Sequence, residues 1–405
     1  MPTMDEISLT PEQNMPSAAA AVEVRRPRIR FDRNEFAGSF GDMGTDVPLL
    51  IGVTLASGLN GTSVLMMFGA LQILSGLAYR LPMPVQPLKA MAAIVIATKT
   101  SPEILFGGGL AIGVVMLVLA MTGLLDWLAA VVPKSVVRGI QFGLGLQLAT
   151  VALTRFVQAD GVVGYCMAFV AFVIIVVLLG NRRLPAAIPV VLLGLLYAMF
   201  FKLDLAVLSR SFSVGCPEFR VPEFADILAG FVLLALPQIP LSLGNSVLAT
   251  KQLAEDLFPE RRITIRRIGI TYSILNLIAP WFGGIPTCHG SGGMAGHFAF
   301  GGRTGGSVII YGTFLLLLGL FFGTGFEHLT TAFPLPILGV LLLFEALTLI
   351  WLIRDTVTER QDFGIVVLVG LLAVGLPYGY LVGIVLGTLL VRTSRWTRLL
   401  SPDVK

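Results

Sequence analysis

The sequence predicts an all-α membrane protein with about 14 transmembrane segments, arranged as two inverted seven-span repeats. The first observation is composition: of 405 residues, 55% are hydrophobic and 13% are charged, whereas soluble domains carry about 25% charged residues. The second is that apolar runs recur from about residue 36 to residue 393 with short loops between them. The third is that the two halves repeat one pattern at a shift of about 200 residues.

Fourteen apolar runs are candidates for helices that cross roughly 30 Å of hydrocarbon. The full-length candidates are 36–58, 63–80, 103–125, 134–153, 160–180, 224–249, 264–282, 305–325 and 333–353. The shorter ones are 83–98, 185–201, 287–300, 362–376 and 377–393. Two of these, 83–98 and 287–300, open with proline or glycine-rich sequence, which predicts two broken half-helices at the membrane midplane.

The distribution of lysine and arginine predicts the orientation of these segments. When the loops are assigned to alternating sides, about 22 of these residues lie in cytoplasmic loops or tails. Five lie outside, namely Lys99, Arg155, Lys202, Arg210 and Arg220. The positive-inside rule then predicts two cytoplasmic termini and a multi-pass protein of the cell (inner) membrane. The net charge of +4 reports this topology, so no nucleic-acid partner is expected.

The polar ends of the chain predict two tails. Residues 1–32 lack the apolar core of a signal peptide and predict a disordered cytoplasmic tail. Residues 394–405 predict a second cytoplasmic tail, with no C-terminal regulatory domain. The three cysteines are scattered and form no metal-binding or disulfide pattern. We therefore expect no metal and no cofactor.

The internal repeat divides the membrane domain into 33–203, with spans 1–7, and 222–393, with spans 8–14. The run 83–87 falls on 284–288, and each of these runs opens a short span. Because seven spans per half is an odd number, the second half must enter the membrane in the opposite orientation. An inverted repeat of this kind places its binding site where the broken helices of the two halves meet.

Two signatures in these halves resemble a known family. The first is Phe40-Gly41-Asp42-Met43-Gly44-Thr45 with Pro48, and the second is Pro286-x-Cys288-His289-Gly290-x-Gly292-Gly293-x-Ala295-Gly296, running on to Phe300-Gly301-Gly302-Arg303-Thr304-Gly305. They look like the signatures of the molybdate transporter family, a branch related to the sulfate permeases. The resemblance covers about 34–393. It implies the seven-plus-seven inverted fold of sulfate and nucleobase permeases, with spans 1–4 and 8–11 as a core domain and spans 5–7 and 12–14 as a gate domain.

This resemblance implies a secondary active transporter that imports a tetrahedral oxyanion by elevator-type alternating access. Molybdate is the first candidate substrate and sulfate the second. A co-transported proton or sodium, the lipid bilayer and a second copy in a homodimer are the implied partners. The alternatives are a nucleobase–proton symporter on the same fold and a passive anion channel. An enzyme is not expected, because the spans contain no arrangement of nucleophile, base and orienting group.

Lys89 is the first candidate substrate ligand. A charged residue in the middle of a membrane helix costs about 2.5–3.5 kcal/mol on insertion scales and is rare without a use. Lys89 opens the half-helix of span 3, three residues after Gln86, so its charge would add to the positive end of the helix dipole. This pair suits a divalent oxyanion. The alternatives are a structural ion pair of Lys89 with Asp42 or Asp46 and an extension of its side chain to the membrane interface.

The half-helix of span 10 supplies the opposing set of donors. Side-chain donors are expected at Thr287, His289 and Ser291, and exposed backbone N–H groups are expected at Gly290, Gly292 and Gly293. Tetrahedral oxyanions are bound by donors that converge from different sides. The alternatives are close helix packing at the glycines and a neutral, hydrogen-bonded core histidine at His289.

Two further groups of polar residues lie inside the spans. Gln238, Ser242 and Asn245 lie in span 8, where related nucleobase permeases carry a carboxylate. Their lack of negative charge favours an anion, and the alternative is that they join helices through hydrogen bonds. Asp42, Thr45 and Asp46 in span 1, with Glu345 in span 12, are expected to carry a coupling proton or to have structural roles.

Overall fold

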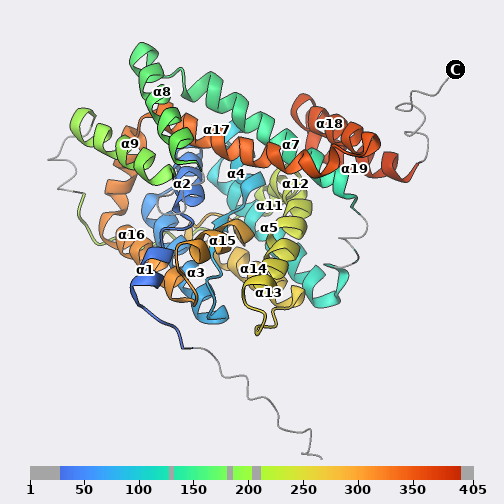
Figure 1. The fold of residues 1–405 in the computed structure, drawn as a ribbon, viewed down its shortest axis with the longest axis horizontal. Helices are drawn as coiled ribbons and strands as arrows, with labels where there is room; N and C mark the ends of the chain where they lie inside the picture. The colour runs from blue at the N-terminus through green and yellow to red at the C-terminus, as the bar shows by residue number, and fades with distance from the viewer. Residues whose placement is uncertain (1–27, 126, 128–131, 180–185, 203–210, 394–405) are drawn as a thin grey trace, which may run out of the picture.

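The computed structural model describes residues 28–125, 127, 132–179, 186–202 and 211–393, and within them the protein is almost entirely helical (Figure 1). Residues 1–27 of the predicted N-terminal tail and the whole predicted tail 394–405 lie outside the described residues.

In the first half of the chain, the described residues form eight helices and one short strand. They are α1 (Arg33–Gly38), α2 (Met43–Ser57), α3 (Gly61–Tyr79), β1 (Val85–Pro87), α4 (Lys89–Thr98), α5 (Pro102–Thr122), α7 (Lys134–Val151), α8 (Gly161–Leu178) and α9 (Ala187–Phe201). A π-helical turn, Ala152–Phe156, extends α7. Asn60 and Ser101 cap α3 and α5 through their side chains, as expected at helix starts.

The second half begins with one long helical stretch. It contains α11 (Phe224–Gly230), α12 (Leu236–Leu241) and α13 (Ala249–Leu257), joined by the π-helical turns Phe231–Ala235 and Ser242–Leu248. It continues with α14 (Ile265–Ile278), β2 (Thr287–His289), α15 (Ser291–Ala299), α16 (Gly306–Ala332), α17 (Leu335–Trp351), α18 (Arg360–Gly375) and α19 (Gly379–Arg392). A 3₁₀ turn, Leu352–Thr356, follows α17.

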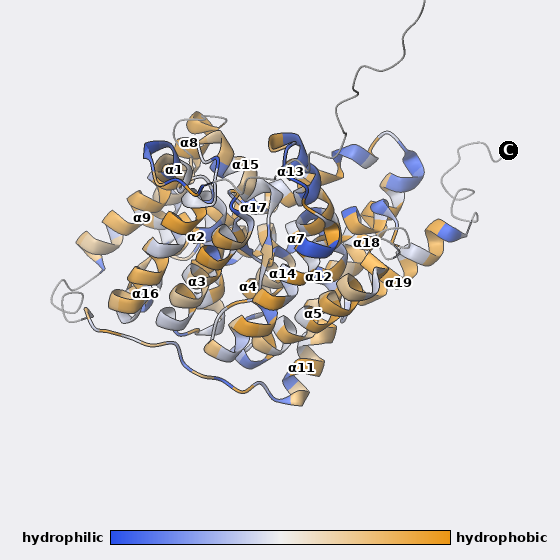
Figure 2. Ribbon diagram, turned by 90° about the horizontal axis from the view of Figure 1, so that it is seen from below, coloured by the Kyte–Doolittle hydropathy of each residue, from blue (hydrophilic) through white to orange (hydrophobic). Residues whose placement is uncertain are grey.

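Length and hydropathy identify this as an integral, multi-pass membrane protein. Within the described residues, seven helical stretches are long and apolar enough to cross a membrane. They are Gly61–Tyr79, Pro102–Thr122, Lys134–Phe156, Gly161–Leu178, Phe224–Leu257, Gly306–Ala332 and Leu335–Thr356. Figure 2 shows hydrophobic residues along helices such as α5, and hydrophilic residues at α1 and α13. Each of the other predicted segments also coincides with a helix, although a shorter one.

The expectation of a purely α-helical protein is wrong at one place. Strands β1 and β2 form an antiparallel pair in which Val85, Gln86 and Pro87 face His289, Cys288 and Thr287. The Leu88 N–H extends this pair by donating to the Pro286 carbonyl at 3.1 Å. The sequence pattern missed these strands because each has three residues and finds its partner about 200 positions away. Because the strands are antiparallel, α4 and α15, which follow them directly, leave the pair in opposite directions.

The helices pack in two sets around this centre. In the first set, α3 packs along α16 and α5 packs along α14 and α11. In the second set, α7 packs along α17 and α18, α8 packs against α17, and α18 packs against α19. The sets meet where α4 contacts α7 and α2 contacts α17. The half-helix α4 therefore lies at the boundary between them.

Candidate functional site

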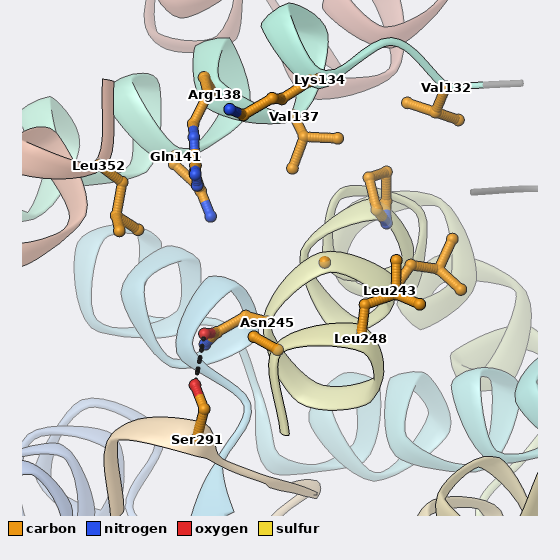
Figure 3. Close-up of a pocket in the computed structure, with 13 residues that line it drawn as sticks. Val132, Lys134, Val137, Arg138, Gln141, Leu243, Asn245, Leu248, Ser291 and Leu352 are labelled. Atoms are coloured by element: carbon orange, nitrogen blue, oxygen red, sulfur yellow. Dashed lines mark hydrogen bonds between the residues drawn. The ribbon is translucent and has the colours of Figure 1, made fainter. Parts of the chain in front are cut away.

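The N-terminus of α15 opens onto a cavity of about 430 Å³. Its N-cap residue, Gly290, provides no side-chain cap. A Cβ at Gly292 would meet no atom within 4 Å, so the first turn is open. Ser291 lines the cavity and donates to Asn245 Oδ1 at 3.3 Å, as Figure 3 shows. The uncapped N–H groups and the hydroxyl of this turn provide donors of the kind that bind anions.

The N-terminus of α4 is capped, in contrast to that of α15. The N–H groups of Ala90 and Met91 both donate to Gln238 Oε1, at 2.9 and 3.3 Å. The Gln238 amide in turn donates to Ser242 Oγ at 3.0 Å, and Ser242 bonds with the Tyr272 hydroxyl at 2.8 Å. Gln238 and Ser242 are buried and do not line the cavity. The structure therefore gives both residues a place in a network that joins α4 to α12 and α14.

Close packing accounts for two of the predicted glycines. A Cβ at Gly290 would lie 1.6 Å from Gln86 Oε1, and one at Gly293 would lie 2.1 Å from Asp42 Oδ2. Gln86 Nε2 donates to Asp42 Oδ1 at 2.5 Å. These glycines therefore allow β1 and the break before α2 to pack against α15. This matches the packing alternative at Gly290 and Gly293, whereas Gly292 remains open.

Lys89 opens α4, as the sequence predicts, and forms a buried ion pair. Its Nζ lies 3.5 Å from Glu345 Oε2 on α17, and the two side chains are 15% and 11% exposed. This matches the alternative of a structural ion pair in kind, but the partner is Glu345 and not Asp42 or Asp46. Spacing along the chain could not reveal Glu345, which reaches Lys89 from the second set of helices. The pair connects α4 to α17 across the boundary between the two sets.

Asp42, Thr45 and Asp46 lie at the start of α2. The N–H groups of Thr45 and Asp46 both donate to the Asp42 carbonyl, at 3.1 and 3.0 Å. Asp42 and Asp46 are buried. This turn begins α2 after the break that separates it from α1, and it places both carboxyl groups inside the protein.

His289 and Thr287 brace the strand that leads into α15. His289 Nε2 lies 2.8 Å from Thr271 Oγ1, and its Nδ1 lies 3.2 Å from the Pro84 carbonyl. Asn276 bonds with the backbone of Thr287 on both sides, accepting from its N–H at 2.9 Å and donating to its carbonyl at 2.6 Å. His289 is fully buried with both ring nitrogens engaged. The structure thus matches the alternative of a hydrogen-bonded core histidine.

The opposite wall of the cavity carries two cations that were expected only as topology charges, together with a glutamine. Lys134, Arg138 and Gln141 line it from α7. Figure 3 shows Arg138 and Gln141 on one side and Asn245 and Ser291 on the other. Their spacing of four and three residues puts these three side chains on one face of a helix, which is a signal that the sequence does contain.

Known proteins identify the family. The family described as "Molybdate transporter of MFS superfamily" matches residues 34–148 and 230–349, which are more than half of the chain. The chain belongs to the molybdate transporter family. Both signatures and both half-helices fall within the matched residues.

Two members of the molybdate transporter family from Arabidopsis thaliana are similar over most of their length. "Molybdate transporter 2" is 32% identical over 390 residues, covering 84% of this chain and 83% of the relative. "Molybdate transporter 1" is 31% identical over 403 residues, covering 88% and 87%. The relatives are named as transporters, in agreement with the expectation that the chain is not an enzyme.

Solved structures agree on the fold. The transmembrane domain of a cyanobacterial bicarbonate transporter, BicA, superimposes with a TM-score of 0.66 at 17% identity, covering 91% of this chain and 99% of that chain. Murine Slc26a9, an anion transporter in the inward-facing state, gives a TM-score of 0.67 at 13% identity, covering 90% and 69%. The molybdate transporter family member described here therefore has the fold of these membrane transporters.

Proposed function

We propose that this protein is a secondary active transporter that imports a tetrahedral oxyanion, with molybdate as the first candidate and sulfate as the second. The observation that carries the proposal is the uncapped start of α15, which opens onto a cavity of about 430 Å³. The described residues that line this cavity include lysine and arginine but no aspartate or glutamate. The names of the relatives give molybdate its priority.

The proposed site combines backbone and side-chain donors. The N–H groups of Ser291 and Gly292 and the Asn245 amide N–H bind the oxyanion from the side of α15 and span 8. The Ser291 hydroxyl, which in the structure donates to Asn245 Oδ1, turns to the anion when it binds. Lys89 does not line the cavity in this structure, where it is paired with Glu345, and we assign it the full positive charge that reaches the anion from the other half-helix during transport. Gln86 orients the strand pair through its bond to Asp42. Gln238, Ser242, Thr287, His289, Gly290 and Gly293 hold these elements in place.

In this proposal, the ion pair of Lys89 with Glu345 breaks when the substrate binds and forms again when the substrate leaves. A divalent anion bound beside Lys89 competes with Glu345 for the ammonium group, which in the structure lies 3.5 Å from Oε2. Breaking this pair separates α4 from α17 and frees the first set of helices to move. Asp42, Asp46 and Glu345 are the candidate carriers of a co-transported proton, and sodium is the alternative co-ion.

The transport mechanism we propose is an elevator. Spans 1–4 and 8–11 form a core that carries the substrate, and spans 5–7 and 12–14 form a gate, in two inverted repeats, 33–203 and 222–393, with 14 spans in total. The cavity lies between α15 of the core and α7 of the gate. Lys134 and Arg138 belong to the side that the positive-inside rule makes cytoplasmic, so we assign this state as open to the cytoplasm. Both termini are cytoplasmic in this scheme, and the transporter is a homodimer.

Ligand-dependent thermal stability tests the substrate class. Molybdate and sulfate should raise the melting temperature of the purified full-length protein in detergent, because a ligand that binds only the folded state stabilises it by mass action. Uracil and xanthine should have no effect. Stabilisation by a nucleobase but not by molybdate would contradict the proposal and indicate a nucleobase symporter. Ion conductance that does not saturate with molybdate, recorded in planar bilayers, would indicate a passive channel.

A further inference from the structure

The wall of the cavity formed by α7 carries a concentrated positive charge. Lys134 and Arg138 both line it, and no acidic side chain of the described residues does. Gln141 lies beside Arg138, whose Nη1 donates to Gln141 Oε1 at 2.9 Å. Figure 3 shows this cationic wall opposite Asn245 and Ser291, across the open part of the cavity.

Asp355 contacts both Lys134 and Arg138 without lining the cavity itself. Arg138 holds it in a two-pronged bond, Nε to Oδ1 at 3.0 Å and Nη2 to Oδ2 at 2.6 Å. Lys134 Nζ lies 2.7 Å from Oδ2. Asp355 does not line the cavity with Ser291, but with Arg138 it lines a neighbouring one of about 480 Å³. One carboxylate therefore faces two cations, which leaves one positive charge in excess at the cavity.

The geometry around Asp355 is the geometry that an oxyanion requires. Two of its oxygens accept three donor groups from two cations, as two oxygens of molybdate or sulfate would. The side chain of Arg138 is only 21% exposed, so its charge is less screened by water than that of a fully exposed side chain. The helix that carries this wall, α7, belongs to the second set of helices and contacts the half-helix α4.

We propose that Lys134, Arg138 and Gln141 form a second oxyanion-binding site, a staging site between the cytoplasm and the half-helix site. The anion reaches Ser291 and Asn245 by crossing the cavity from this wall. Asp355 limits the affinity of the staging site, because it neutralises one of the two charges and competes for the same donors. The inference rests on the proposed function, since it assigns this site to the same substrate.

Equilibrium binding of radiolabelled molybdate to the purified full-length protein tests whether Lys134 and Arg138 favour anion binding and Asp355 opposes it. Asp355→Asn, which keeps one acceptor oxygen for Arg138, should tighten binding by about three- to tenfold, because one opposing charge is removed. Arg138→Gln and Lys134→Gln should weaken binding and reduce its dependence on salt concentration. In the Arg138→Gln variant, the additional change Asp355→Asn should raise molybdate affinity much less than it does in the wild type.

The matched controls are Lys251→Gln and Glu255→Gln. This pair, with Nζ and Oε2 2.7 Å apart, lies on α13 on the same predicted side of the membrane and does not line the cavity. Both variants should bind molybdate as the wild type does. If Arg138→Gln does not fold, Lys134→Gln carries the test, because its side chain is 63% exposed.

The outcomes separate the two proposals. If the wild type binds molybdate and folded Asp355→Asn binds it with unchanged or weaker affinity, the staging site is overturned. The proposed function stands in that case. Equal effects of the control variants and of Lys134→Gln also overturn the staging site, since the effect would then come from overall charge. Absence of molybdate and sulfate binding in the folded wild type overturns the proposed function itself.

Discussion

Glu35 shows how one buried carboxylate fixes the start of a long helix. Its Oε1 accepts from the N–H groups of Arg303 and Thr304 at 3.0 and 2.8 Å, and its Oε2 accepts from the N–H of Ser307 at 2.9 Å. Glu35 is fully buried. It thereby satisfies two backbone donors in the loop before α16 and one in the first turn of α16, which would otherwise lack partners.

We expect Glu35→Gln to destabilise the protein by about 1–3 kcal/mol. The side-chain NH₂ group of glutamine would face backbone N–H groups in the protein interior, so one acceptor oxygen is lost and donors face donors. The melting temperature in detergent measures this destabilisation. Glu103→Gln is the matched control, since Glu103 also lies in a first helical turn but is exposed. A melting temperature that falls equally in both variants would mean that the capping of α16 by Glu35 contributes little.

At the scale of elements, α15 packs backbone against backbone at Gly41, in the break between α1 and α2. A Cβ at Gly41 would lie 2.3 Å from the Gly296 carbonyl carbon and 2.4 Å from the His297 nitrogen. Backbone atoms cannot move aside as the end of a side chain can. This contact therefore sets the position of the half-helix that carries the proposed site.

Gly41→Ala should therefore lower stability by about 1–3 kcal/mol through overpacking. Gly292→Ala in the same neighbourhood should leave the melting temperature unchanged or slightly higher, because its Cβ meets nothing within 4 Å and alanine favours a helix. Thermal unfolding of both variants compares them directly. Tolerance of alanine at position 41 would show that α15 does not require this close approach.

The helices were predictable from the sequence, whereas the partners of polar groups were not. Hydropathy locates a helix at every predicted segment, and Lys89 is the first residue of α4 as expected. The strand pair, the cap that Gln238 places on α4 and the ion pair of Lys89 with Glu345 all join residues far apart in sequence. Periodicity and spacing describe one segment at a time, so they cannot select partners across the fold. The helix-face spacing of Lys134, Arg138 and Gln141, in contrast, lies within one segment and indicates a shared face in the sequence itself.

At the scale of the whole molecule, labelling of the free cysteines tests the predicted orientation of the protein in the membrane. Cys166 and Cys216 are exposed and Cys288 is buried. Cys216 lies in the segment between α9 and α11, which the positive-inside rule places outside the cell. With Cys166 and Cys288 replaced by alanine, a membrane-impermeant maleimide should label Cys216 in intact cells.

A cysteine introduced by Glu359→Cys is the control for the opposite side. It lies next to Arg360, in a loop that the same rule makes cytoplasmic, and it should be labelled only after the cells are permeabilised. The reverse labelling pattern at the two positions would mean that the topology is opposite to the predicted one. The assignment of the cavity to the cytoplasmic side would then be wrong.

Uptake of radiolabelled molybdate into proteoliposomes tests the central claim most directly. The wild type should take up molybdate with saturation, sulfate should compete and uracil should not, and Lys89→Ala should lose most of the uptake because the charge at the start of α4 is gone. Folding of the variant is checked by its melting temperature. Uptake that is absent in the folded wild type, that uracil inhibits, or that Lys89→Ala retains with unchanged affinity would contradict an oxyanion site built on Lys89 and the start of α15.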